Sequence, residues 1–126
     1  MSKSKVVVID DQATGRSILV KILNNSFVNT EIISFEAAKD ALIWLEEYNA
    51  ELVITDYSMP DVDGLAFTEK LKIFNHHKNT PVIMITAIAD NSVRDQADKL
   101  GIVDFIRRPI NQNDCVNTVS KYLKLS

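Results

Sequence analysis

The stretch LVITDYSMPDVDG, residues 52–64, decides the fold class because it joins a buried strand to an acidic turn. Residues 52–55 are suited to a strand that is covered on both faces, and they run directly into Asp56. The turn that follows contains Pro60, which fixes the backbone, and it closes on Gly64. A buried strand that ends in a carboxylate is typical of a parallel sheet with a functional site at its strand ends.

The composition predicts one domain over residues 1–126, with 46% hydrophobic and 25% charged residues. No apolar stretch is long enough to span a bilayer, and the N-terminus does not resemble a secretory signal. A single cysteine, Cys115, favours a reduced, cytoplasmic setting. A net charge of −3 without a Lys/Arg cluster argues against direct binding of nucleic acid.

Short apolar runs alternate with segments of helical periodicity along the whole chain. The runs are residues 5–9, 31–35, 52–55, 81–86 and 103–106. The first, third and fourth are uninterrupted, as in parallel strands buried on both faces, whereas the second is more polar and fits an edge strand. Between and after the runs, apolar stripes predict helices around residues 18–23, 38–45, 67–74, 93–100 and 115–123. Polar or turn-forming residues, such as Asn24-Asn25, are expected to separate the elements.

Five successive strand–helix units predict an α/β fold with right-handed crossovers and helices on both faces of a parallel sheet. A dinucleotide-binding fold would require a glycine-rich first turn, but residues 10–15 read DDQATG. We therefore expect a doubly wound, flavodoxin-like fold with five helices and the strand order 2-1-3-4-5.

That strand order brings several polar side chains to one edge of the sheet. The expected group is Asp10 and Asp11 after strand 1, Asp56 after strand 3, Thr86 after strand 4 and Arg108 after strand 5. Two carboxylates about 4 Å apart repel by on the order of 4 kcal/mol at an effective dielectric constant of ~20, so a cation is needed. Mg²⁺ fits this need, with Asp11, Asp56 and the backbone carbonyl of Ser58 as ligands and Asp10 acting directly or through water.

A carboxylate held beside Mg²⁺ can also act as a nucleophile towards phosphorus. Asp56 would accept the phosphoryl group, with Mg²⁺, the Thr86 hydroxyl and the Arg108 guanidinium each contacting one of its oxygens. The product is an aspartyl phosphate, whose lability suits a timed signal.

At these motifs the sequence resembles the receiver domains of two-component response regulators. The resemblance covers essentially the full length and is carried by VVVIDD (6–11), VITDYSMPDVDG (53–64), PVIMITA (81–87) and GIVDFIRRPI (101–110). It implies that Asp56 is the phosphoacceptor, Asp10 and Asp11 are the acidic pair for Mg²⁺, Thr86 is the switch hydroxyl and Phe105 is the aromatic switch. It also implies a phosphohistidine donor on a sensor kinase or a phosphotransfer protein.

The resemblance further implies a switching surface made of helix 4, strand 5 and helix 5. Phosphorylation would draw Thr86 towards the phosphoryl group, and Phe105 would rotate into the vacated space. The changed surface would then control a downstream effector, a fused output domain or a homodimer. In this interpretation the chain is a signalling domain and not an enzyme with an external substrate.

One residue departs from the family pattern, because Arg108 stands where the family has Lys. Arginine keeps the charge but replaces a compact ammonium with a planar fork. Either Arg108 still clamps the phosphoryl group, or the chain is a phosphorylation-independent interaction module. Two further alternatives are a flavin carrier, which the acidic first turn disfavours, and a phosphohydrolase, which would need an acid at Ser58.

Other polar residues are expected to have structural or solvent roles. Asp61 and Asp63 are interpreted as turn and N-cap residues, and His76-His77 as part of a solvated loop.

Overall fold

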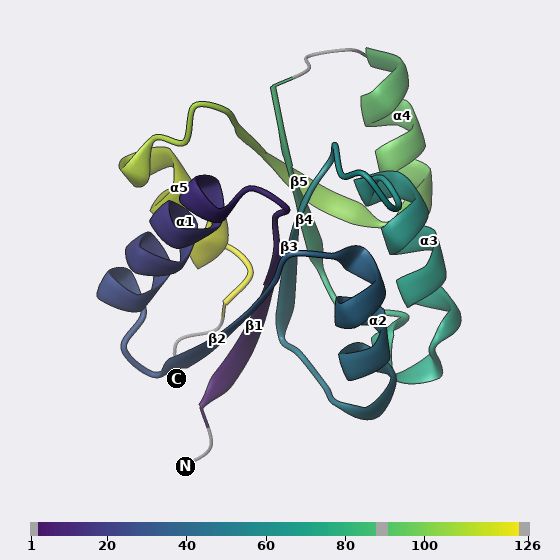
Figure 1. Cartoon of the computed structure of the whole chain (residues 1–126), viewed down its shortest axis with the longest axis horizontal. Helices are drawn as coiled ribbons and strands as arrows, with labels where there is room; N and C mark the ends of the chain where they lie inside the picture. The colour runs from purple at the N-terminus through teal and green to yellow at the C-terminus, as the bar shows by residue number, and fades with distance from the viewer. Residues whose placement is uncertain (1–2, 88–90, 124–126) are drawn as a thin grey trace.

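The computed structural model describes residues 3–87 and 91–123 and contains a five-stranded parallel sheet between two layers of helices (Figure 1). The strands are β1 (Ser4–Ile9), β2 (Thr30–Phe35), β3 (Leu52–Asp56), β4 (Val82–Thr86) and β5 (Ile102–Arg107). Their order is β2-β1-β3-β4-β5, and every neighbouring pair is parallel. The predicted fold class and strand order are therefore confirmed, with β2 at an edge.

Helices cover both faces of the sheet. They are α1 (Ala13–Ser26), α2 (Ala38–Glu47), α3 (Gly64–Ile73), α4 (Asn91–Leu100) and α5 (Gln112–Ser120), with a short 3₁₀ helix, η1 (Asn75–His77), after α3. In Figure 1, α1 and α5 lie on one side of the sheet, and α2, α3 and α4 on the other. None of the helices within the described residues has the length and apolar character required to cross a membrane.

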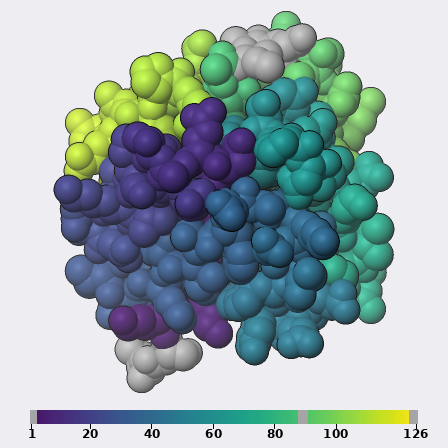
Figure 2. Space-filling view, in the orientation of Figure 1, coloured from purple at the N-terminus to yellow at the C-terminus, as the bar shows by residue number. Residues whose placement is uncertain are grey.

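Alternate side chains of each central strand pack into two separate hydrophobic cores, one on each face of the sheet. In β1, Val6 and Val8 pack against α1 and α5, whereas Val7 and Ile9 pack under α2 and α3. This two-sided burial explains why the strands are apolar without alternation. Cys115 is buried in the core between the sheet and helices α1 and α5. Burial raises the pKa of its thiol to about 11, so Cys115 behaves as a small apolar residue. Figure 2 shows the N-terminal half of the chain, in purple to teal, making up most of the near face of the molecule.

Helix α1 extends further than the sequence predicted. Asn24 and Asn25, expected to break the chain, lie in its last turn, and the helix ends at Ser26. The backbone N–H of Phe27 then donates to the Leu23 carbonyl at 2.9 Å. Leu23 and Phe27 are both buried, so packing outweighs the low helix propensity of asparagine.

The turn after β3 is fixed at both ends. The Gly64 N–H donates to the Tyr57 carbonyl at 2.8 Å, and a Cβ at Gly64 would lie 2.6 Å from the backbone oxygen of Asp56. Only glycine allows α3 to start this close to the strand end. Asp63 caps α3 by accepting from the Ala66 N–H at 2.8 Å, which confirms its predicted N-cap role. The backbone around Asp56 is therefore held rigidly.

The interpretation of His77 as a solvated residue is wrong. His77 is fully buried, with Nε2 2.7 Å from the Leu45 carbonyl and Nδ1 2.9 Å from the Thr80 hydroxyl oxygen. The Leu45 carbonyl lies in the last turn of α2, where backbone oxygens lack helical partners. The imidazole therefore donates from Nε2 to this helix end and accepts at Nδ1 from Thr80. His76, its neighbour, is exposed as expected, although its Nε2 also lies 2.7 Å from the Leu45 carbonyl.

We expect His77→Ala to lower the free energy of unfolding by about 1–3 kcal/mol, because it removes one of two imidazole contacts to the Leu45 carbonyl and the imidazole partner of both the Tyr48 carbonyl and the Thr80 hydroxyl. Burial lowers the pKa of His77, so the folded protein keeps the ring neutral, whereas the unfolded chain protonates it near pH ~6.5. Its contribution is therefore complete above that pH and is lost as pH falls below it. Urea unfolding above and below pH ~6.5 measures both effects. Asn79→Ala, an exposed substitution in the same turn, is the control, and an equal loss in both variants contradicts the assignment.

Candidate functional site

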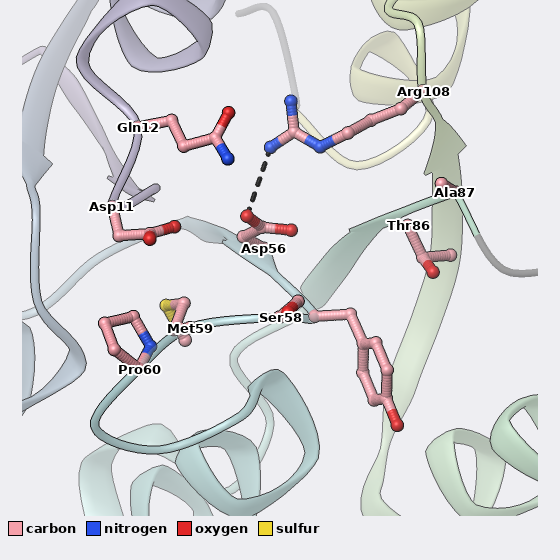
Figure 3. Close-up of a pocket in the computed structure, with 10 residues that line it drawn as sticks. Asp11, Gln12, Asp56, Ser58, Met59, Pro60, Thr86, Ala87 and Arg108 are labelled. Carbon is pink, nitrogen blue, oxygen red and sulfur yellow. Dashed lines mark ion pairs between the residues drawn. The ribbon is translucent and has the colours of Figure 1, made fainter.

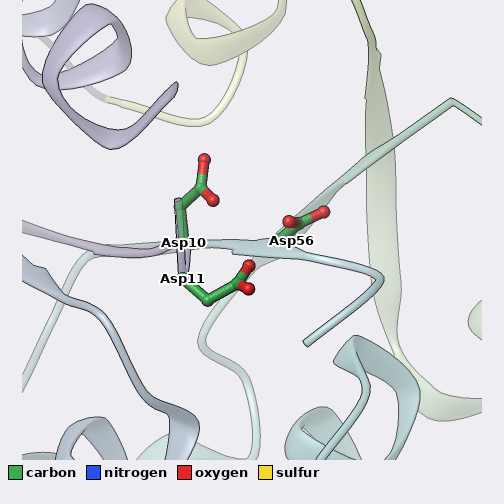
Figure 4. A group of neighbouring side chains, drawn as sticks. All are labelled: Asp10, Asp11 and Asp56. Atoms are coloured by element: carbon green, nitrogen blue, oxygen red, sulfur yellow. The ribbon is translucent and has the colours of Figure 1, made fainter. Parts of the chain in front are cut away.

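Three carboxylates meet at the carboxyl ends of β1 and β3 (Figure 4). Asp10 and Asp11 follow β1, and Asp56 is the last residue of β3. One carboxylate oxygen from each lies within 4.8 Å of the others. Asp10 is fully buried, Asp56 is 6% exposed and Asp11 is half-buried. The sequence prediction that the strand order brings these acids together is confirmed by this geometry.

Arg108, just beyond β5, supplies the positive charge that partly balances the acids. Its Nη2 atom lies 2.8 Å from Asp10 Oδ2 and 3.2 Å from Asp56 Oδ2, so one nitrogen bridges two carboxylates. Figure 3 shows the guanidinium reaching across the site, with the ion pair to Asp56 dashed. Burial alone would lower the pKa of Arg108, but its hydrogen bond to Asp10 and the charge of Asp56 raise it. The guanidinium therefore stays charged.

Asp10 is held from several directions. Its Oδ1 accepts from the Gln12 N–H at 3.0 Å, and its Oδ2 is the partner of Arg108. The backbone carbonyl of Asp10 accepts from Arg16 Nη1 at 2.7 Å. Both carboxylate oxygens thus have protein donors, and the side chain lies beneath the cleft and not at its surface.

Asp11 differs from Asp10 because part of its hydrogen-bonding capacity is unused. Among the residues that the structure describes, Asp11 Oδ1 is a buried side-chain oxygen without a hydrogen-bond partner. In Figure 4 its carboxylate points towards Asp56. A buried carboxylate oxygen that faces another carboxylate is unfavourable unless a cation joins them.

The pKa of Asp56 is raised above its ordinary value, chiefly by burial. The Arg108 guanidinium acts in the opposite direction, while the charge of Asp10 raises the pKa further. A hydrogen bond from the Ser58 backbone lowers it, and Asp11 adds a smaller increase. Without an additional cation, the ionised form of Asp56 is therefore less favourable in the folded protein than in water.

A cleft of about 510 Å³ opens directly over the carboxylates. Its lining comprises Asp11, Gln12, Asp56, Tyr57, Ser58, Met59, Pro60, Thr86, Ala87 and Arg108. Five of these were predicted from the sequence as site residues, four of the others are their immediate chain neighbours, and Pro60 follows two residues after Ser58. Position next to a strand end would have identified Gln12, Tyr57 and Ala87, although their residue types carry no chemical signal.

Thr86 and Phe105 occupy different environments. Thr86 ends β4, is buried and lines the cleft on the opposite side of Asp56 from Asp11 (Figure 3). Phe105 is half-buried on β5 and does not line the cleft. The guanidinium carbon of Arg94, on α4, lies 4.8 Å from the centre of its ring. This cation–π contact between α4 and β5 was not predicted, because it joins residues on two separate elements.

The site fits a hard divalent cation and does not fit an anionic cofactor. Carboxylate oxygens converge beside the buried Asp11 oxygen that lacks a partner among the described residues, and such oxygens are the ligands that Mg²⁺ prefers. Three acids against one guanidinium would repel the phosphate of a flavin nucleotide. The arrangement can hold a cation, present Asp56 as a nucleophile and stabilise negative charge from the Arg108 side.

Comparisons with known proteins identify the family. Residues 6–120 match the family described as the response regulator receiver domain. The chain is 32% identical over 120 residues to the cyclic di-GMP phosphodiesterase response regulator RpfG of Xanthomonas campestris pv. campestris (strain 8004). That match covers 95% of this chain but 32% of RpfG. A second relative, a probable transcriptional regulator of Porphyridium aerugineum, is 32% identical over 124 residues, which cover 98% of this chain and 50% of that protein. The chain thus spans a third to a half of these relatives.

Solved structures support the fold assignment. The chemotaxis protein CheY4 of Vibrio cholerae superposes with a TM-score of 0.90 at 20% identity, covering 97% of this chain and 100% of CheY4. The receiver domain of the sensor histidine kinase PA1611 from Pseudomonas aeruginosa PAO1 gives a TM-score of 0.84 at 15% identity, covering 96% and 98% of the two chains. That structure is described with a magnesium ion coordinated in its active site cleft.

Proposed function

The chain belongs to the response regulator receiver domain family, and from this membership we propose that it is a phosphorylatable signalling switch with Asp56 as the phosphoacceptor. The observation that carries the proposal is the placement of Asp56 at the end of a buried strand, facing a cleft and in contact with Arg108. The close approach of Gly64 to the Asp56 backbone oxygen fixes the backbone from which the carboxylate projects. We take residues 1–126 as one receiver domain.

Mg²⁺ is the proposed cofactor, because carboxylate oxygens are its preferred ligands and Asp11 Oδ1 has no hydrogen-bond partner within residues 3–87 and 91–123. Asp11, Asp56 and the backbone carbonyl of Ser58 would hold the ion. Asp10 is the fourth member of this set and would act through a water, since Arg108 and Gln12 already bond both of its carboxylate oxygens. When bound, the ion neutralises negative charge on the carboxylates and on the incoming phosphoryl oxygens.

The proposed reaction moves a phosphoryl group between two proteins. One Asp56 carboxylate oxygen attacks phosphorus, the P–N bond of a phosphohistidine on a sensor kinase or phosphotransfer protein breaks, and the imidazole nitrogen leaves with the electron pair. Arg108 lies beside Asp56 and can bond a phosphoryl oxygen without a long movement. Thr86 lines the opposite side of the cleft and can donate its hydroxyl to another oxygen.

The proposed output is a change in the face formed by α4, β5 and α5. Thr86 ends the strand next to β5, and Phe105 lies on β5 under the Arg94 guanidinium. Full switching from 1:99 to 99:1 requires about 5.5 kcal/mol of differential stabilisation. One charge-assisted hydrogen bond contributes about 1.5–3 kcal/mol, so the Thr86 movement and the repacking of Phe105 must act together.

We propose that the face formed by α4, β5 and α5 is the surface that binds partners. A downstream effector, an output domain fused to the receiver or a second copy of the chain could each bind α4, β5 and α5. Relatives such as RpfG, a cyclic di-GMP phosphodiesterase response regulator, are longer than this chain, which supports control of an attached domain. The proposed setting is the cytoplasm, in keeping with the single buried thiol.

Incubation with acetyl phosphate tests the function directly. We expect the intact protein to gain the mass of one phosphoryl group when Mg²⁺ is present, and none when EDTA removes the metal, because the carboxylates then repel the donor. Mass spectrometry of the whole chain measures the gain, and borohydride reduction followed by peptide mapping locates it. A protein that is folded, binds Mg²⁺ and still gains no phosphoryl group is instead a phosphorylation-independent interaction module.

A further inference from the structure

Gly15, in the first turn of α1, lies directly against the Arg108–Asp10 pair. A Cβ atom at Gly15 would be 2.8 Å from Asp10 Oδ2 and 3.1 Å from Arg108 Nη1. The first distance is shorter than real Cβ contacts, and the second is tighter than nearly all of them. The space above Asp10 is therefore filled by the guanidinium, and any larger residue at position 15 would compete for it.

The backbone does not explain why this residue is glycine. Gly15 lies inside α1, and Gly101 is the glycine with a positive φ in the described part of the chain. Glycine is less favourable than alanine within a helix, so α1 alone would be more stable with alanine at this position. The explanation must come from the contact with the acidic site.

The neighbours of Gly15 are not free to move aside. Asp10 is fully buried, with Oδ1 bound to the Gln12 N–H and Oδ2 bound to Arg108. Arg108 Nη2 is bound at the same time to Asp56, so the planar guanidinium has a fixed orientation with Nη1 towards α1. A lysine side chain ends in a single nitrogen and would not project a second nitrogen over Gly15.

We propose that Gly15 is a positioning residue for Arg108: its missing side chain leaves the space in which the guanidinium bridges Asp10 and Asp56. Gly15, Asp10 and Arg108 form one unit that places a fixed positive charge beside the phosphoacceptor. The proposal rests on the proposed function only for its consequence in phosphoryl transfer. Its geometric claim concerns the metal-free protein and requires no phosphodonor.

This geometry has a consequence for cation binding. A guanidinium held at Asp10 and Asp56 repels a divalent ion that approaches the same carboxylates. A methyl group at position 15 would displace the guanidinium and leave the negative charges of Asp10 and Asp56 less neutralised. A bound Mg²⁺ ion would then relieve more of the repulsion between these carboxylates. Gly15→Ala is therefore expected to tighten Mg²⁺ binding, which simple damage to α1 would not do.

The test compares Gly15→Ala in three backgrounds: wild type, Arg108→Ala and Arg108→Lys. In the metal-free wild type we expect the melting temperature to fall by about 3–8 °C. In both Arg108 backgrounds we expect a clearly smaller fall, because the contact with Arg108 Nη1 is gone and Asp10 Oδ2, released from the guanidinium, can turn away from the new methyl group. Thr14→Ala, an exposed substitution in the same turn, is the matched control and should change the melting temperature little in any background.

Calorimetric titration with Mg²⁺ supplies the second measurement. We expect Gly15→Ala to lower the dissociation constant for Mg²⁺ by about 3–10-fold in the wild type and to leave it unchanged in Arg108→Ala. Equal falls in melting temperature in all three backgrounds, or weaker Mg²⁺ binding in Gly15→Ala, overturn the proposal. Neither measurement uses a phosphodonor, so failure of Asp56 to accept phosphate would leave this result intact.

Discussion

Replacing Asp56 with asparagine is expected to abolish phosphoryl uptake from acetyl phosphate. The asparagine amide is not a nucleophile towards phosphorus, and no other carboxylate can take its place. Asp10 is buried with both oxygens bonded, and Asp11 faces the proposed ion. Intact-mass spectrometry after incubation with acetyl phosphate and Mg²⁺ measures the loss. Asp63→Asn is the matched control, because asparagine can still cap α3 and uptake should remain.

The same substitution makes a prediction about stability that is independent of phosphate. The pKa of Asp56 is raised in the folded protein, so its contribution to stability is complete below the unfolded pKa and is lost as pH rises through the folded value. Asparagine does not titrate and escapes this loss. Metal-free Asp56→Asn is therefore expected to be at least as stable as wild type at neutral pH, and the difference should shrink in acid. Phosphoryl uptake by this variant would contradict the assignment of Asp56.

The sheet and its order could be predicted because burial on both faces leaves a direct mark on the sequence. Residues 52–54 and 82–85 are apolar at successive positions since each face meets a different layer of helices. The ends of elements were less predictable. Asn24 and Asn25 continue α1 because Leu23 and Phe27 are buried next to them, and local propensity does not contain that information.

The acidic site could be predicted for a similar reason, since its members sit at the carboxyl ends of strands whose order was inferred. The residues that were missed depend on contacts between distant parts of the chain. His77 is buried because the end of α2, 32 residues earlier in the sequence, needs a donor at Leu45. Gly15 matters because Arg108 lies above it, although the resemblance drew attention to Arg108 alone. The type of a single residue does not indicate which distant residue it will contact in the folded chain.

The second large effect concerns Arg108, and the size of the change in the phosphorylation rate depends on which residue replaces it. Arg108→Ala is expected to slow phosphorylation by acetyl phosphate by about 10²-fold, as when one preorganised donor to a developing negative charge is removed. Arg108→Lys keeps a positive charge near Asp56 and is expected to remain within about tenfold of wild type, although it loses the bridge between two carboxylates. Rates at saturating Mg²⁺, followed by mass or by phosphoprotein electrophoresis, measure both variants.

Arg107→Ala is the matched control, because Arg107 is exposed and outside the cleft, and its phosphorylation rate is expected to match wild type.

The rate measured for Arg108→Ala is most informative when the Mg²⁺ affinity of the same variant is also measured. Removal of the guanidinium relieves its repulsion of the ion but also removes a donor to the phosphoryl oxygens, so Mg²⁺ should bind more tightly while phosphoryl transfer becomes slower. A variant that binds Mg²⁺ more weakly and is slow for that reason would recover its rate at high Mg²⁺. Such recovery would show that Arg108 supports the metal site and does not act on the phosphoryl group.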